Sequence, residues 1–317
     1  MSGSPETSPI FVTGFSRGGT TILMNLLASH PDVCTVGEVH QIFKGSSVMD
    51  SKWTILKKSL LRDLPMMLRT GQDFFSPRLW TPRRSLGPNS LGRIHRTLGN
   101  AKRNSGHDHL NRLKLPGVMY SQEEINEARM LGKNLDGTVF LSDVLTKIYP
   151  GSSFCGMVRH GLAVCEGHVR RGRNAKRVGM MYRTVVQKML DDAEHHPRYK
   201  VSRFEDLLAD PIQQLRTMWQ QLGLDPSPTQ VRLQRRKVMN EAGQHQLTNQ
   251  SGNEWEVYWL GIDELPDQLD PDINRRQIQR LADRDRDDFL AEAGPIMETL
   301  GYATDGSCHS NPELVAA

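Results

Sequence analysis

Residues 9–33, PIFVTGFSRGGTTILMNLLASHPDV, constrain the fold of this chain more than any other stretch. An apolar run closed by a glycine predicts a buried strand, and the residues after the glycine-rich turn have helical periodicity. One face of that helix collects four apolar side chains, Ile22, Leu23, Leu26 and Leu27. Strand, glycine loop and helix in this order predict the first unit of a parallel α/β sheet.

Two later segments have the same character. SFCGMV (153–158) is an apolar run of the kind that is covered on both faces, and YKVSRFEDLLADP (199–211) leads into a second amphipathic helix. That helix begins near Pro211 and ends before Gly223, as the preferences of helix ends predict. We therefore predict an α/β fold in three layers, a parallel sheet flanked by helices.

The segment from about 45 to 130 interrupts this rhythm and is predicted to be an inserted helical and irregular lobe on the acceptor side. Within it, residues 78–114 contain nine Lys or Arg residues but a single acidic residue, Asp108. We expect a flexible N-terminus over 1–9, one domain over 10–302 and a flexible tail over 303–317.

Composition excludes several classes of protein. Charged residues are 24% of the 317 and the net charge is +4, which is too small to indicate nucleic-acid binding. The four cysteines form no CxxC pair, which favours a reducing compartment. Neither a signal peptide nor an apolar run of about 18 residues is evident, so we expect a cytoplasmic protein without an integral membrane segment.

The loop GFSRGGTT has the chemistry of an anion site. A helix N-terminus offers free N–H groups, glycines 18 and 19 allow close approach of the backbone, and Thr20 and Thr21 add hydroxyl donors. Arg17 can place a planar cation against a phosphate. The alternative is a glycine turn that binds nothing. Because no Gly-Lys-Ser/Thr follows the loop, a nucleoside triphosphatase is the weaker interpretation.

These residues resemble the signature of sulfotransferases that use 3′-phosphoadenosine 5′-phosphosulfate (PAPS). GFSRGGTT (14–21) followed by HPD (30–32) is similar to the first family motif, with Gly18 at a position that is often serine. MVRHG (157–161) resembles the second motif, and FEDLLADP (204–211) and LGY (300–302) resemble later ones. The resemblance implies a sulfotransferase fold related to P-loop NTPases, with PAPS as donor and no metal.

By this resemblance, Arg17, Gly18, Gly19, Thr20 and Thr21 would bind the 5′-phosphosulfate, and Arg159 would bind the 3′-phosphate. The serine that the family has eight residues after that arginine is Gly167 here. Either Cys165, His168 or a backbone N–H replaces it, or the affinity for the donor is reduced. Among Arg170, Arg171 and Arg173, Arg171 is a further candidate, unless this stretch is a solvated basic turn. Residues 250–255 correspond only loosely to the family's C-terminal glycine loop.

The chemistry also needs a base and a cation beside the transferred group. Glu38 is at the spacing of the catalytic glutamate in the tyrosylprotein branch, although it could instead order the loop by pairing with Arg17. His40 is the second candidate for the base. Lys133 resembles the lysine of a Lys-x-Pro segment, but the proline is absent, so a surface lysine is the alternative. For Glu205 and Asp206 we favour a structural role at the helix start.

The predicted reaction is transfer of a sulfuryl group to a hydroxyl of a carbohydrate, glycolipid or small natural product. Tyrosine in proteins is less favoured, because family members with that activity have a membrane anchor that we do not find in this sequence. A P-loop kinase-like enzyme and a non-catalytic nucleotide-binding module are the alternatives. The basic segment could contact an acidic acceptor or cover the site, and a homodimer is possible.

Overall fold

The computed structural model describes residues 8–39, 88–106, 111, 115, 117–236 and 255–305. Its centre is a sheet of five parallel strands in the order β2-β3-β1-β4-β5. The strands are β1 (Ile10–Gly14), β2 (Val33–Glu38), β3 (Arg129–Leu135), β4 (Ser153–Val158) and β5 (Tyr199–Arg203). The predicted parallel α/β class is confirmed.

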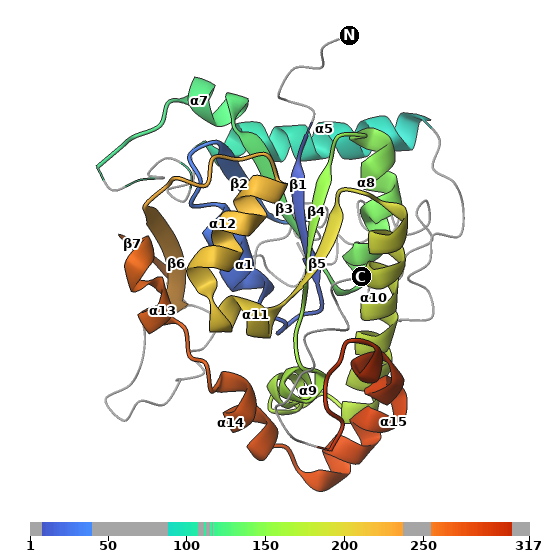
Figure 1. The fold of residues 1–317 in the computed structure, drawn as a ribbon. Helices are drawn as coiled ribbons and strands as arrows, with labels where there is room; N and C mark the ends of the chain where they lie inside the picture. Colours follow the sequence, from blue (N-terminus) through green and yellow to red (C-terminus); the bar gives the residue numbers. More distant parts are fainter. Residues whose placement is uncertain are drawn as a thin grey trace, which may run out of the picture.

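Helices cover both faces of this sheet, which gives three layers (Figure 1). On one face lie α1 (Thr20–Leu27), α11 (Phe204–Ala209) and α12 (Pro211–Gln221), and on the other lie α8 (Ser142–Ile148) and α10 (Ala175–His195). A long helix, α5 (Pro88–Ser105), crosses the sheet at the ends where the strands begin. The short helix α7 (Gln122–Glu127) packs beside it.

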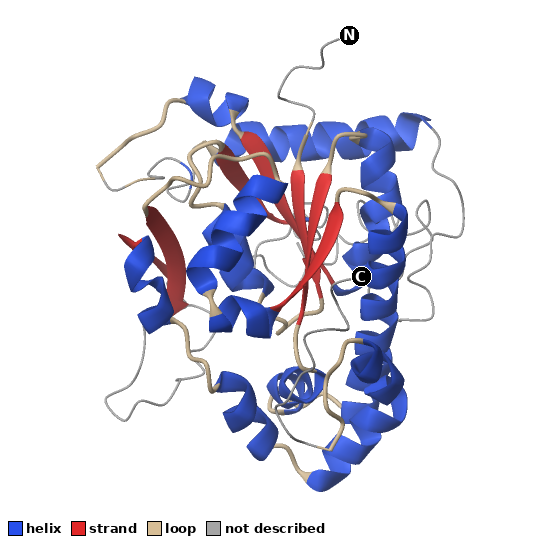
Figure 2. Ribbon diagram, viewed as in Figure 1, coloured by secondary structure: helices blue, strands red, loops and turns tan. Residues whose placement is uncertain are grey.

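Smaller elements complete the chain. The 3-10 helix η4 (Asp136–Leu141) follows β3, and α9 (Gly161–Val169) follows β4. A two-stranded antiparallel ribbon, at the left in Figure 2, consists of β6 (Gln230–Arg236) and β7 (Trp255–Gly261). The C-terminal elements are η5 (Ile262–Glu264), α13 (Leu265–Gln268), α14 (Ile273–Gln279) and α15 (Asp283–Thr299).

The alternation of side chains along the strands builds one hydrophobic core on each face. In β1, Phe11 points to the core under α8, α10 and α15, whereas Ile10 and Val12 point to the core under α1 and α12. All five residues of β1 are buried. This explains why the strand is an uninterrupted apolar run, as expected for the centre of a parallel sheet.

The connection that follows β1 and the connection that follows β4 run over opposite faces of the sheet. The chain passes from β1 through α1 toward β2, and from β4 through α9 and α10 toward β5. The carboxyl ends of β1 and β4 therefore form a topological switch point, which is where open α/β sheets bind ligands. In Figure 1, α9 and α14 lie beyond this edge of the sheet.

The three strand units expected from the sequence are present at β1, β4 and β5. The structure adds β2, β3 and the β6–β7 ribbon, which the sequence analysis did not identify as strands. Of the predicted lobe (45–130), α5 and α7 are described, and its last two residues already belong to β3. No helix among the described residues is long and apolar enough to span a bilayer.

Candidate functional site

The loop between β1 and α1 has a conformation that only certain residues can adopt. Gly19 has φ of 88°, and a Cβ atom there would lie 2.3 Å from the ring of Phe204. The first turn of α1 contains no acidic residue and its N-cap has no side-chain hydrogen bond. Among the described residues, the N–H groups of Gly19, Thr20 and Thr21 have no backbone acceptor. This helix N-terminus can therefore receive an anion.

Side chains from other elements hold the preceding loop residues in place. The Ser16 N–H donates to Asp136 Oδ1 at 2.8 Å, and Ser16 O lies 3.1 Å from His168 Nε2. Arg17 is in the left-handed region with φ of 72°, and its carbonyl accepts from Arg159 Nη1 at 3.1 Å. These protein contacts fix the backbone of the loop, which preorganises it for a ligand.

His168 and Asp136 are titratable groups in this support. Burial lowers the pKa of His168 to about 4. The imidazole is therefore neutral near pH 7, and since a carbonyl only accepts, Nε2 carries the proton that is donated to Ser16 O. Burial also raises the pKa of Asp136. The ring of His168 packs against Phe15, 5.2 Å between centroids, so its described contacts are with the loop.

Lys133 and Glu38 meet at the ends of β3 and β2, where their backbones are paired in register. Lys133 Nζ lies 2.7 Å from Glu38 Oε1 and donates to Thr21 Oγ1 at 3.1 Å. The Lys133 side chain is 5% exposed and that of Glu38 is 24% exposed. The alternative of a surface lysine is therefore wrong. Lys133 connects the predicted base with the predicted phosphate loop.

Arg159 follows β4 at the switch point and is buried. Its guanidinium lies 4.7 Å from the ring centroid of Phe204, the same ring that packs against Gly19. Nε donates to Asn274 Oδ1 at 2.7 Å, and Nη2 donates to Gln277 Oε1. Burial lowers the pKa of Arg159 to about 10, so the side chain remains cationic at neutral pH. A fixed cation at a strand end fits a phosphate.

Gly167 lies in α9 beside these groups. A Cβ atom at this position would be 3.4 Å from Arg17 Cγ and 3.7 Å from Gln277 Nε2, which are ordinary contact distances. Arg171 Nη1 donates to the Gly167 carbonyl at 2.6 Å, so its guanidinium lies near the site although the residue is exposed. Cys165 is fully buried in the core.

Glu205 has structural partners. Its carboxylate accepts from the His160 N–H at 3.0 Å, from Tyr302 Oη at 2.7 Å and from Asn274 Nδ2. His160 is the N-cap of α9, so Glu205, which lies in the first turn of α11, also contacts the start of α9. Asp206 pairs with Arg203, 2.6 Å between oxygen and nitrogen. These contacts agree with the structural role that we favoured.

Two predicted features lie outside the described residues: His40 and most of the loop at 250–255. In contrast, the sequence analysis missed Asp136, Asn274 and Gln277. Asp136 follows directly after an apolar strand, a signal that could have identified it. The two amides in α14 have no local motif, and they lie 115 and 118 positions after Arg159.

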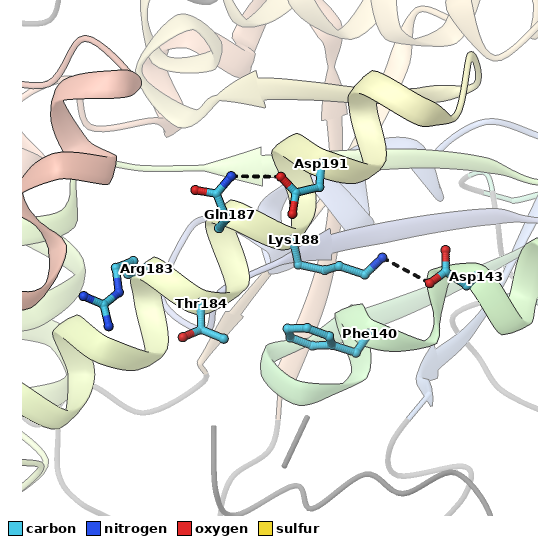
Figure 3. Close-up of a pocket in the computed structure, with 7 residues that line it drawn as sticks. All are labelled: Phe140, Asp143, Arg183, Thr184, Gln187, Lys188 and Asp191. Atoms are coloured by element: carbon cyan, nitrogen blue, oxygen red, sulfur yellow. Dashed lines mark hydrogen bonds and ion pairs between the residues drawn. The ribbon is translucent and has the colours of Figure 1, made fainter. Parts of the chain in front are cut away.

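A pocket of about 510 Å³ lies elsewhere, between α10 and the η4–α8 segment (Figure 3). Among its lining residues, Lys188 extends toward Asp143 at 3.3 Å, and Gln187 Nε2 donates to Asp191 at 2.8 Å. None of its lining residues belongs to the loop or to the cluster around Lys133. The N-terminus of α1 and the buried Arg159 are thus at the carboxyl edge of the sheet, away from this pocket.

Three comparisons place the chain among known proteins. A model of the sulfotransferase family matches residues 9–228, and no curated protein sequence matches. Among solved structures, the sulfotransferase domain of the Synechococcus PCC 7002 olefin synthase is 17% identical, with a TM-score of 0.45 over 93% of this chain and 96% of that one. A sulfotransferase from Alicyclobacillus acidocaldarius is 16% identical, with a TM-score of 0.36 over 90% and 96%.

The sulfotransferase domain from the curacin biosynthetic pathway is 17% identical, with a TM-score of 0.40 over 70% of this chain and 78% of that one. These structural likenesses are too distant to transfer substrates or residue roles. The family model spans more than half of the chain and includes β1 through α12, with the loop, Glu38, Lys133 and Arg159. The resemblance seen in the sequence is confirmed, and the chain belongs to the sulfotransferase family.

Proposed function

We propose that the site takes PAPS as its donor, with the 5′-phosphosulfate at the N-terminus of α1 and the 3′-phosphate at Arg159. The single observation that supports this best is the hydrogen bond of 3.1 Å from Arg159 Nη1 to the Arg17 carbonyl, which holds Arg159 beside the loop. One buried cation and one helix N-terminus offer two anion sites within a single cluster. A donor with a 3′-phosphate and a 5′-phosphosulfate on one ribose requires such a pair.

In the proposed reaction, the acceptor oxygen forms a bond to sulfur while the bond from sulfur to the bridging phosphate oxygen breaks. The products are the sulfate ester and 3′-phosphoadenosine 5′-phosphate (PAP). Negative charge grows on the bridging oxygen, and cations held in advance at that place lower the barrier. Lys133, which donates to Thr21 Oγ1 of the loop, and Arg17 are the candidates for this role.

Glu38 accepts the proton of the acceptor hydroxyl in this proposal. Its carboxylate is within 2.7 Å of Lys133 Nζ and is partly exposed, whereas the lysine is buried. A hydroxyl that approaches from the exposed side could therefore reach the base while the lysine contacts the donor. His40 stays the second candidate. We propose a carbohydrate, a glycolipid or a small natural product as the acceptor.

Transfer of radiolabelled sulfuryl groups from PAPS tests the proposal. The chain is incubated with pools of hydroxyl compounds from these three classes, and in parallel with labelled ATP and magnesium. We expect label from PAPS in at least one product, without a magnesium requirement. Phosphorylated products from ATP, with no sulfated product in any pool, would contradict the proposal and favour the kinase-like alternative.

A further inference from the structure

Arg159 owes its orientation to two amide side chains of α14. Asn274 and Gln277 are one helical turn apart, and both present their oxygen to the guanidinium, at Nε and at Nη2. A guanidinium has five N–H groups in a fixed plane. Because three of its nitrogens already donate to Asn274, Gln277 and Arg17, its rotation is fixed, and N–H groups remain for a ligand.

The two amides are themselves fixed by carboxylates. Asn274 Nδ2 donates to Glu205 Oε1, and Gln277 Nε2 donates to Glu166 Oε2 at 2.8 Å. A guanidinium only donates hydrogen bonds, so each amide must direct its oxygen to Arg159, which leaves its nitrogen for the glutamate. The orientation of both amides follows from these partners.

Gln277 has a donor left over. Its amide nitrogen carries two N–H groups, one is used by Glu166, and the other has no acceptor among the described residues. The surroundings are buried: Gln277 is 7% exposed, Arg159 8% and Glu166 4%. A buried N–H without an acceptor is destabilising, and an anionic oxygen beside Arg159 would satisfy it.

We propose that α14 completes the subsite for the donor's 3′-phosphate, with Gln277 as a direct N–H donor to the phosphate and Asn274 as a positioning residue for Arg159. Gln277 Nε2 lies 3.7 Å from the position that a Cβ atom on Gly167 would occupy. The amide is therefore next to the place where the family's serine side chain would be. The proposal rests on the proposed donor and specifies how its 3′-phosphate is recognised.

Calorimetric titration with PAP and with 5′-AMP, which lacks the 3′-phosphate, tests the role of Gln277. In Gln277→Met the side chain keeps its length but loses both N–H groups. We expect the Kd for PAP to rise about 10- to 100-fold, the range for loss of a hydrogen bond to a charged group, while the Kd for 5′-AMP is unchanged. The matched control is Gln279→Met, since Gln279 is exposed on the same helix, and we expect wild-type affinities for both ligands.

Gln277→Asn keeps the amide but withdraws it by one methylene, and it serves if the methionine variant does not fold. The same selective loss is expected. Equal weakening of PAP and 5′-AMP, or no weakening of either, would overturn the role of Gln277. If wild type binds the two ligands equally, the proposed donor fails, and this inference with it. If wild type prefers PAP and the variants keep that preference in full, only the present inference fails.

Discussion

A substitution of Glu38 can distinguish an effect on the transfer rate from an effect on donor binding. In Glu38→Gln the side chain keeps its size but can no longer take the proton from the hydroxyl of the acceptor substrate. We expect the transfer rate to fall about 10²- to 10⁴-fold, the usual contribution of a general base. Affinity for PAP should not decrease, because Lys133 keeps its contact with Thr21. Rapid-quench measurements and calorimetry give the two quantities.

The control for this prediction is Glu127→Gln, an exposed glutamate in α7, which should leave both quantities unchanged. A transfer rate for Glu38→Gln within about threefold of wild type would be too small a loss for a general base. It would then remove Glu38 from the reaction and leave His40 as the candidate.

Because the pKa of His168 is lowered in the folded protein, we expect the free energy of unfolding to depend on pH. Its folded pKa of about 4 is below the ordinary value of 6.5, so the unfolded chain binds this proton first as the pH falls. The stabilisation is complete above pH 6.5 and is lost as the pH falls toward 4. The loss is on the order of 3 kcal/mol. Urea unfolding of wild type and His168→Gln, measured from about pH 7 to 4.5, checks it.

Glutamine at 168 can donate to Ser16 O without titrating, so the free energy of unfolding should fall more steeply for wild type than for the variant. The raised pKa of Asp136 acts in the opposite direction, but it is present in both proteins and cancels in the difference. Parallel curves for the two proteins would show that His168 does not titrate as the geometry requires.

For single residues, the sequence predicted the site candidates that belong to motifs. It missed those that are far from the motifs in the sequence and reach Arg159 only in the folded chain. Arg17, Thr21, Glu38, Lys133 and Arg159 were all identified, and the structure brings them to one edge of the sheet. Whether these side chains are buried could not be predicted, because the burial of Lys133, for example, depends on the pairing of β2 with β3. The two amides of α14 are recognisable only once their contact with Arg159 is known.

At the scale of elements, the turn from β1 into α1 is the most demanding piece of backbone. Gly19→Ala would place a methyl group 2.3 Å from the Phe204 ring at a φ of 88°. We expect destabilisation of more than about 2 kcal/mol, since the left-handed conformation alone costs 1–2 kcal/mol. PAP affinity should fall as well, because the loop must shift. Urea unfolding and calorimetry measure the two effects.

Gly223→Ala is the control for backbone strain. It has a φ of 69° and nothing within 4 Å of its Cβ position, in the turn after α12. Destabilisation of about 1–2 kcal/mol with unchanged PAP affinity is expected there. Equal effects of the two substitutions on stability and affinity would mean that the contact with Phe204 does not shape the loop.

Strands with strong apolar patterns were predictable, and strands that tertiary pairing imposes were not. β1 and β4 are continuous apolar runs, so their identity follows from composition. β3 reads RMLGKNL and contains a buried lysine and a buried asparagine near its carboxyl end, which conceals the strand from any hydrophobicity pattern. The polar residues are there because the strand ends at the site.

For the whole molecule, the C-terminal helix α15 is part of the central core. Phe289 is fully buried between α9 and α10, next to Gly161 and Gly179. We expect Phe289→Ala to lower the free energy of unfolding by about 3–5 kcal/mol. The neighbouring Leu290 is only half buried, so Leu290→Ala should cost clearly less. A cost for Phe289→Ala as small as that for Leu290→Ala, in urea unfolding, would contradict the assignment of α15 to the core.

The family could be identified from the sequence because its motifs are local and stand in a fixed order. The domain limits and the proposed lobe are different, since they depend on contacts between distant segments, and they stay predictions. The residues that follow Val39, among them His40, lie outside the described residues, so the part of the candidate site that the structure describes is the proposed donor edge. Residue types at the donor edge are therefore more informative about the donor than about the acceptor.

Recognition of a 3′-phosphate at Arg159 is the central property proposed for this site. We would measure the binding of PAP, 5′-AMP and ATP to wild type and to Arg159→Ala by calorimetry, with thermal unfolding as a check of the fold. We expect wild type to bind PAP much more tightly than the other two nucleotides and the variant to lose this preference. Equal binding of PAP and ATP by wild type, or an unchanged preference in a folded variant, would contradict this proposal.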